Sequence, residues 1–204
     1  MSFASFREKI VYQPILLGVF ALFASGLLAL ASSVTSDVIA AAEAKDLRDS
    51  LSEVLPAGFA DNDFLNDTIE IERNGKPVTI YRARHKNVIN GAIFKVAERG
   101  YAADIQVLMA VDAEGRTIGV RVVKHAETPG LGDKIELGKS PWIRDFDGKT
   151  LGNPPLERWG VKKDGGIFDQ FAGATITPRA VVKAVKGGLE FYSEHRKEIL
   201  GEKS

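Results

Sequence analysis

Residues 169–181 read Asp-Gln-Phe-Ala-Gly-Ala-Thr-Ile-Thr-Pro-Arg-Ala-Val and predict the beginning of a long helix. Thr177 suits the N-cap, and Pro178 suits the first helical position because its φ angle fits a helix and its missing N–H would be unpaired there. Apolar residues then recur at helical spacing, at Val181, Val182, Val185 and Leu189. We therefore expect a C-terminal helix over residues 178–199.

The residues just before this helix leave room for a ligand. Gly173 and Ala174 carry almost no side-chain bulk, so backbone N–H groups there could approach a bound group closely. The positive end of the helix dipole lies behind them, and Thr175 adds a hydroxyl group. This arrangement suits a phosphate, although the same residues also begin ordinary helices.

The stretch resembles the flavin-attachment motif of the FMN-binding domain family, which includes the RnfG-type proteins of Rnf complexes and the NqrC-type proteins of the sodium-pumping NADH:quinone reductase. That motif reads Asp-x-x-Ser/Thr-Gly-Ala-Thr/Ser-x-Thr. The matching positions are Asp169, Gly173, Ala174, Thr175 and Thr177, whereas Ala172 replaces the usual Ser or Thr. The resemblance implies that FMN is joined through its phosphate to Thr175 by a separate, magnesium-dependent flavin transferase with FAD as donor. Asp169 is then expected to organise the loop through hydrogen bonds from backbone N–H groups.

A second informative stretch, residues 127–132, reads Glu-Thr-Pro-Gly-Leu-Gly. Its Pro-Gly pair predicts a tight loop, which by itself is typical of a plain connection. The string also resembles the other signature of the FMN-binding domain family, in the order along the chain that the family has. The resemblance implies that Thr128, Leu131 and Gly132 bracket the flavin from the other side. Glu127 would either accept a hydrogen bond from the ring or brace the loop.

The N-terminal region is apolar and uncharged from Ile10 to Ser36. About 20 apolar residues span a bilayer, so we expect one transmembrane helix over residues 14–35. A cleaved signal peptide is the alternative, but its apolar part is usually shorter, roughly 7–15 residues. Arg7 and Lys9 precede the span, and Asp37 is the first charge after it. The positive-inside rule then predicts a cytoplasmic segment 1–13 and a domain 36–204 on the outer side of the membrane. The resemblance implies that this is a periplasmic FMN-binding domain on a bacterial inner membrane.

The rest of the chain predicts an α+β fold with an antiparallel sheet. A helix is expected to begin at Ser36 and to run to residue 55, before Pro56. Runs rich in β-branched residues predict strands over residues 68–73, 78–83, 88–96, 105–111 and 117–123, with hairpin turns at 74–76 and 112–116. A short helix is expected over residues 135–138. An antiparallel meander with helices packed on one face is the simplest architecture.

Composition excludes several classes of site. Lys and Arg total 27 and Asp and Glu total 27, so no basic field is available for nucleic acid. The chain has no cysteine, which excludes disulfides and Cys-ligated iron–sulfur clusters, and its three histidines are scattered, so we expect no metal site. Trp142 and Trp159 could shield a flavin ring, but as core or rim residues they need no such role.

The resemblance implies an electron-transfer subunit of an Rnf-type complex, which couples ferredoxin/NAD electron flow to ion translocation. Its partners would be the other integral-membrane and redox subunits, together with the flavin transferase during maturation. The NqrC-type protein of a sodium-translocating quinone reductase is the close alternative, because both proteins share these motifs. A membrane-anchored, non-redox scaffold with an unmodified Thr175 is an alternative from another class. No nucleophile–base pair or nicotinamide fingerprint indicates a self-contained enzyme, and we assign no catalytic residue.

Overall fold

The computed structural model describes residues 12–73 and 75–202, which fall into two compact units, Met1–Leu47 and Arg48–Ser204. Arg7 and Lys9, whose charges predict the orientation, and Asn74, in the first predicted hairpin, lie outside the described residues.

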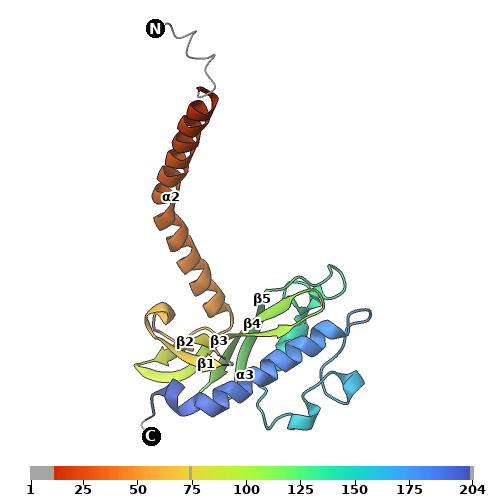
Figure 1. The fold of residues 1–204 in the computed structure, drawn as a ribbon. Coiled ribbons are helices and arrows are strands. Elements are labelled where there is room, and N and C mark those ends of the chain that lie inside the picture. The colour runs from red at the N-terminus through yellow and green to blue at the C-terminus, as the bar shows by residue number, and fades with distance from the viewer. Residues whose placement is uncertain (1–11, 74, 203–204) are drawn as a thin grey trace, which may run out of the picture. The chain divides into compact units, whose positions relative to one another are not determined.

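One continuous helix, α2 (Tyr12–Glu53), makes up the described part of the first unit and extends into the second (Figure 1). Its segment Tyr12–Leu30 has a mean hydropathy of 2.0 and is long and apolar enough to cross a membrane. The helix expected to begin at Ser36 is instead part of α2, which passes through that position without a break. No glycine or proline lies between residues 31 and 53 to stop the helix, so it continues through residue 36.

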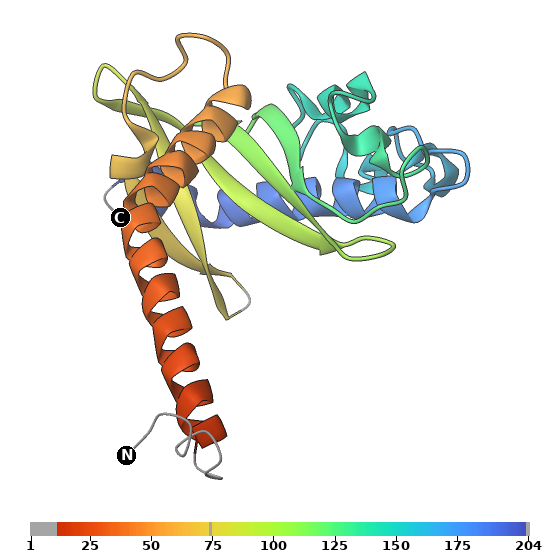
Figure 2. The ribbon, with the colours of Figure 1, turned by 90° about the horizontal axis from the view of Figure 1, so that it is seen from above.

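The second unit is built on a five-stranded antiparallel sheet with the order β1-β2-β3-β4-β5, which confirms the predicted meander (Figure 2). The strands are β1 (Thr68–Arg73), β2 (Lys76–His85), β3 (Val88–Arg99), β4 (Asp104–Asp112) and β5 (Thr117–Lys124). The pairing of Arg73 with Lys76 leaves a tight loop between β1 and β2, where a hairpin was expected. Most strands extend a residue or more beyond their predicted ends.

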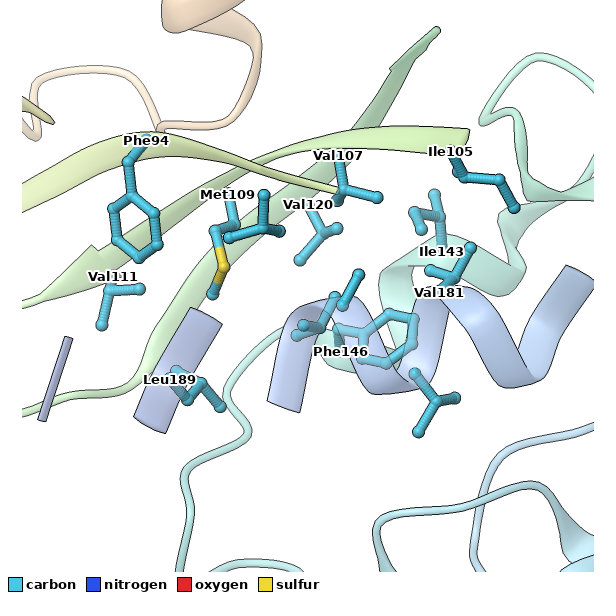
Figure 3. Close-up of a cluster of buried hydrophobic side chains, with 14 of the residues drawn as sticks. Phe94, Ile105, Val107, Met109, Val111, Val120, Ile143, Phe146, Val181 and Leu189 are labelled. Atoms are coloured by element: carbon cyan, nitrogen blue, oxygen red, sulfur yellow. The ribbon is translucent and has the colours of Figure 1, made fainter. Parts of the chain in front are cut away.

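The main core lies between one face of the sheet and α3 (Ile176–Leu200), the long C-terminal helix (Figure 3). Strand register explains which residues enter it, because directly paired residues point to the same face. One such row runs across four strands through Ile80, Phe94, Met109 and Val120, all fully buried. Helix α3 supplies Val181 and Leu189 to the same core.

The opposite face of the sheet is also covered, so the expectation of helices on one face only was wrong. The neighbouring row of the register contains Ile93, Ala110 and Gly119, and it contacts the chain at the end of α2. A Cβ atom on Gly119 would lie 2.5 Å from the carbonyl oxygen of Val54, so only glycine permits this approach. Leu51, in the last turns of α2, is fully buried there. The end of α2 is thus part of the domain.

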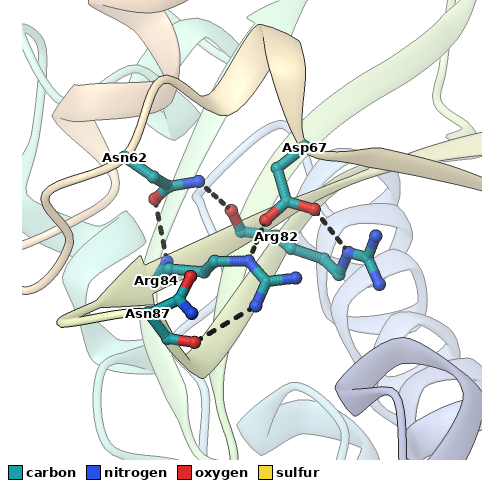
Figure 4. Close-up of polar contacts among 5 residues, drawn as sticks. All are labelled: Asn62, Asp67, Arg82, Arg84 and Asn87. Carbon is teal, nitrogen blue, oxygen red and sulfur yellow. Dashed lines mark hydrogen bonds and ion pairs between the residues drawn. The ribbon is translucent and has the colours of Figure 1, made fainter.

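A polar network fixes the chain between α2 and β1 against β2 (Figure 4). Asp67 accepts hydrogen bonds from Nε of Arg82, at 2.8 Å, and from Nε of Arg84. Asn62 donates to the carbonyl oxygen of Arg82 and accepts from the N–H of Arg84. Burial alone would raise the pKa of Asp67, but the hydrogen bond from Arg84 and the charges of both arginines outweigh burial and lower it. The network is therefore strongest when Asp67 is ionised.

Residues 125–175 form no long element and instead fold around an aromatic cluster. Its rings are Trp142, Phe146, Trp159, Phe168 and Phe171, with neighbouring centroids between 4.5 and 6.4 Å apart. Both tryptophans are buried, as core residues. The short helix expected over residues 135–138 is instead a single 3-10 turn, Asp133–Ile135. The indole N–H of Trp142 donates to the carbonyl oxygen of Asp169 at 2.9 Å, which attaches the motif stretch to this cluster.

Candidate functional site

Helix α3 begins earlier than its sequence suggests. Thr175 is the N-cap residue and Thr177 lies inside the first turn, so the expected cap at Thr177 was wrong. The hydroxyl of Thr177 is buried, 1% exposed, and donates to Oε2 of Glu127, which removes it from capping. Pro178 is still in the first turn, where a missing N–H costs no helical hydrogen bond. Thr175 makes no side-chain cap bond, so its hydroxyl is not used within the helix.

The turn before α3 presents unpaired donors. The N–H of Ala174 donates to the carbonyl oxygen of Phe171, and Gly173 has a φ angle of 81°, a left-handed conformation that favours glycine. Within the described ranges, the N–H groups of Thr175, Ile176 and Thr177 have no hydrogen-bond partner. Together with the helix dipole, these donors form an anion-binding arrangement.

These donors open into a cleft of about 230 Å³. Three segments line it: the turn between β3 and β4, the loop 127–132, and the start of α3. The lining residues are Tyr101, Glu127, Thr128, Leu131, Gly132, Gly173, Ala174, Thr175, Ile176 and Thr177. Of the residues predicted from sequence, the structure brings all but Asp169 to this one cleft.

Glu127 holds the three segments together. Its Oε1 accepts from the backbone N–H groups of Tyr101, at 3.0 Å, and Ala102, at 3.4 Å, while its Oε2 accepts from Thr177. The side chain is only 5% exposed, and a Cβ on Gly100 would lie 2.5 Å from Oε1. Of the two roles considered for Glu127, the geometry supports bracing, because its carboxylate oxygens are engaged by the protein.

The loop 125–132 is also held from its other end. Nδ1 of His125 accepts from the N–H of Glu127 at 3.1 Å. A neutral His125 must then carry its proton on Nε2, which lies 2.9 Å from Oε1 of Glu136 and donates to it. Backbone bonds from Leu131 and Gly132 to the carbonyl oxygen of Thr128 close the turn. The loop is therefore ordered before any ligand arrives.

Asp169 does not line the cleft. Its carboxylate forms an ion pair with Nζ of Lys162 at 2.6 Å, and both side chains are more than half exposed. The expectation that this carboxylate accepts backbone N–H bonds was wrong, because only the main chain of Asp169 is bound inward, through Trp142. Asp169 thus belongs to the surface beside the attachment turn.

The rim of the cleft is apolar and unusually exposed. Tyr101 is 67% exposed, Leu131 42% and Ile176 47%, and each comes from a different segment. Sequence reasoning missed Tyr101 and Ile176. A signal existed for Tyr101, because a lone aromatic residue in a short turn, Gly-Tyr-Ala-Ala, has no neighbouring apolar pattern that would bury it.

The residues present fit a flavin nucleotide. Unpaired N–H groups at a helix N-terminus match a phosphate group, and an apolar rim matches a flat aromatic ring system. Within residues 12–73 and 75–202, no group of three or more His, Asp or Glu side chains is placed to hold a metal ion.

Comparisons with known proteins cover nearly the whole chain. The FMN-binding domain family matches residues 100–190, and the RnfG N-terminal region family matches residues 1–54. The G subunit of the ion-translocating oxidoreductase complex of Cereibacter sphaeroides is 47% identical over 95% of this chain and 89% of its own length. That of Pseudomonas aeruginosa is 45% identical over 97% of this chain and 95% of its own. The crystal structure of NqrC from Shewanella oneidensis is similar at 21% identity, with a TM-score of 0.48 over 69% of this chain and 71% of that one.

Proposed function

The chain belongs to the RnfG family, the G subunits of the ion-translocating oxidoreductase complexes, and on this premise we propose that it carries electrons on an FMN attached covalently to Thr175. The complex would couple ferredoxin/NAD electron flow to ion translocation. Its other membrane and redox subunits would then be the partners that deliver and remove the electrons.

The position of Thr175 carries the proposal. Its hydroxyl is free of a capping bond and stands at the mouth of a cleft beside unpaired N–H groups of the first turn of α3. A phosphodiester on that hydroxyl would have one negative charge, which the N–H groups of Ile176 and Thr177 and the helix dipole would stabilise. Thr177 itself is excluded as the attachment residue, because its hydroxyl is buried against Glu127.

Attachment requires a second protein. In the proposed step the Oγ1–P bond forms between Thr175 and the FMN phosphorus of FAD, the phosphoanhydride bond breaks, AMP leaves, and the hydroxyl proton is released. Phosphoryl transfer needs a metal and charge clamps, which the described residues of the cleft do not supply. A magnesium-dependent flavin transferase would supply both, with Thr175 as its substrate.

The size of the cleft supports a carrier rather than a closed enzyme site. Ligand pockets usually measure about 300–1,000 Å³, so a cleft of about 230 Å³ would enclose only part of an FMN. Once bound, the flavin ring would supply the redox chemistry, while the protein orients it. A partly exposed ring is accessible to partner proteins, and a covalent bond prevents its loss.

The proposed location is the inner membrane, with the FMN-binding domain in the periplasm. The apolar segment Tyr12–Leu30 supports a single retained anchor. Arg7 and Lys9 before this segment support a cytoplasmic N-terminus. The covalent tether fits this location, because a dissociated FMN would be lost outside the cytoplasm.

A denaturing gel viewed under ultraviolet light tests the proposal. The full chain is produced with and without a flavin transferase, and we expect a fluorescent band only with it. Thr175→Ala should abolish the band, while Thr175→Ser should keep it because the hydroxyl remains. Thr128→Ala is the matched control, since it removes another threonine hydroxyl from the same cleft. A dark wild-type band beside an active transferase would instead favour a scaffold with unmodified Thr175.

A further inference from the structure

Among the exposed large apolar residues that line the cleft, Tyr101 is the most exposed, and it has no assigned role. It leaves 67% of its surface open to solvent while still lining the cleft. Resting on the proposed FMN attachment to Thr175, we propose that Tyr101 is a flavin-contacting residue whose ring covers one face of the isoalloxazine. It would thereby set how much of the flavin remains accessible to partners.

The first support is the fixed position of Tyr101. A tip of a turn is usually mobile, but here the N–H groups of Tyr101 and Ala102 are both bound by the buried carboxylate of Glu127. The turn is closed by a bond of 2.9 Å from the N–H of Gly100 to the carbonyl oxygen of Ala103. A turn whose backbone is already fixed loses little entropy when its side chain contacts a ligand, which favours a ligand-binding role.

The second support is the distribution of apolar surface. Exposed large apolar residues of the domain are few, and Tyr101, Leu131 and Ile176 all line this cleft. A cleft of about 230 Å³ is too small for a whole flavin nucleotide, so a ring tethered at Thr175 would have to extend over this rim. The rim offers one aromatic face, that of Tyr101, and two aliphatic side chains.

The third support is chemical complementarity. Stacked aromatic pairs are stabilised by about 0.5–1.5 kcal/mol beyond their buried area. The isoalloxazine is electron-poor when oxidised and tyrosine is electron-rich, so the contact would be strongest with the oxidised flavin. Close contact with tyrosine also quenches flavin fluorescence, which gives a direct readout that does not depend on the rest of the complex.

The test compares flavin emission per covalently bound flavin in the full chain, made with a flavin transferase. Tyr101→Leu keeps apolar bulk but removes the aromatic ring, and Tyr101→Trp keeps an aromatic quencher. In Tyr101→Leu, the loss of stacking should lower the ratio of stacked to unstacked flavin by about 2- to 10-fold. The flavin emission of the folded protein should rise correspondingly. Tyr101→Trp should stay as dim as the wild type.

Tyr81→Leu is the matched control, because Tyr81 lies on β2 and does not line the cleft. A denaturing gel on the same samples measures covalent flavin independently of stacking. Equal gel bands with unchanged native emission in Tyr101→Leu would overturn the role of Tyr101 and leave the proposed function intact. Dark gel bands in every sample would overturn the proposed function, and the flavin contact with it.

Discussion

The hydrogen bond between Thr177 and Glu127 should be a major source of stability for the domain. The pair is buried, with Thr177 1% and Glu127 5% exposed, and Glu127 also binds two backbone N–H groups. Thr177→Val keeps the shape of the side chain but leaves Oε2 of Glu127 without its donor. An unsatisfied buried acceptor costs about 1–3 kcal/mol, so we expect Thr177→Val to lower the free energy of unfolding by about 2 kcal/mol.

Glu127→Gln gives an independent estimate of the same interaction. The amide retains one oxygen for the backbone donors but replaces a carboxylate, whose hydrogen bonds are roughly twice as strong as neutral ones. We expect the free energy of unfolding to fall by about 2 kcal/mol, because each of about two hydrogen bonds weakens by about 1 kcal/mol. Because the two side chains contact directly, the double variant should lose about 1–2 kcal/mol less than the sum.

Urea unfolding of the flavin-free full chain in detergent measures these losses. The only two tryptophans, Trp142 and Trp159, both lie in the aromatic cluster, so their emission reports the domain and not the apolar helix. With a denaturant slope of about 2 kcal/mol per molar urea, each single variant should shift the midpoint by about 1 M.

Thr128→Val is the matched control for this prediction. It removes an exposed threonine hydroxyl that lines the same cleft, and should cost no more than about 0.5 kcal/mol. If Thr177→Val costs no more than Thr128→Val, or if the double variant is additive, the bond does not join the two segments and the reasoning fails.

Three further predictions concern the rest of the chain. The pKa of Asp67 is lowered in the folded state, so its contribution to stability is fully present above the ordinary value of 3.8 and is lost as the pH falls from there through the lowered folded-state pKa. Asp67→Asn should therefore show a flatter stability profile in acid urea titrations. A Cβ at Gly166 would lie 1.8 Å from the carbonyl oxygen of Gly160, so Gly166→Ala should lower the urea midpoint by about 1 M. A Cβ at Gly160 would lie 3.9 Å from its nearest neighbour, so Gly160→Ala should lower the midpoint by much less. In the cysteine-free chain, Glu157→Cys should react with an impermeant maleimide in intact cells and Ser5→Cys only after lysis; the reverse pattern would place the domain inside.

The sheet could be predicted because its signals are local. Alternating β-branched residues and the two hairpin turns identified all five strands, with errors only at their ends. The helix boundaries were less predictable. The cap preference of Thr177 was overridden by Glu127, which is 50 residues away in sequence, and the helix start expected at Ser36 does not occur because α2 runs through that position.

The candidate site was predictable in its motifs but not in its contacts. Both motif stretches, 127–132 and 169–177, contribute residues to the cleft, where their glycine and threonine residues leave room for a ligand. Asp169 was misplaced because the indole N–H of Trp142 turns its main chain inward and Lys162 binds its carboxylate outside. The sequence could mark Tyr101 as exposed but not place it, because only the folded sheet brings the turn between β3 and β4 to this cleft.

The bond between Glu127 and Thr177 explains why the two motifs belong together. The loop 127–132 contains no helix or strand that would fix it, whereas Thr177 lies in the first turn of α3, so the bond ties this loop to the helix. Glu127 connects the turn that carries Tyr101 to the first turn of α3, which carries Thr175. Breaking the bond should therefore disturb both the attachment residue and the rim that would receive the ring. On this reasoning Glu127→Gln and Thr177→Val should each lower stability and also raise the emission of the attached flavin, whereas a substitution that affects stability alone, such as Gly166→Ala, should leave the emission per folded molecule unchanged.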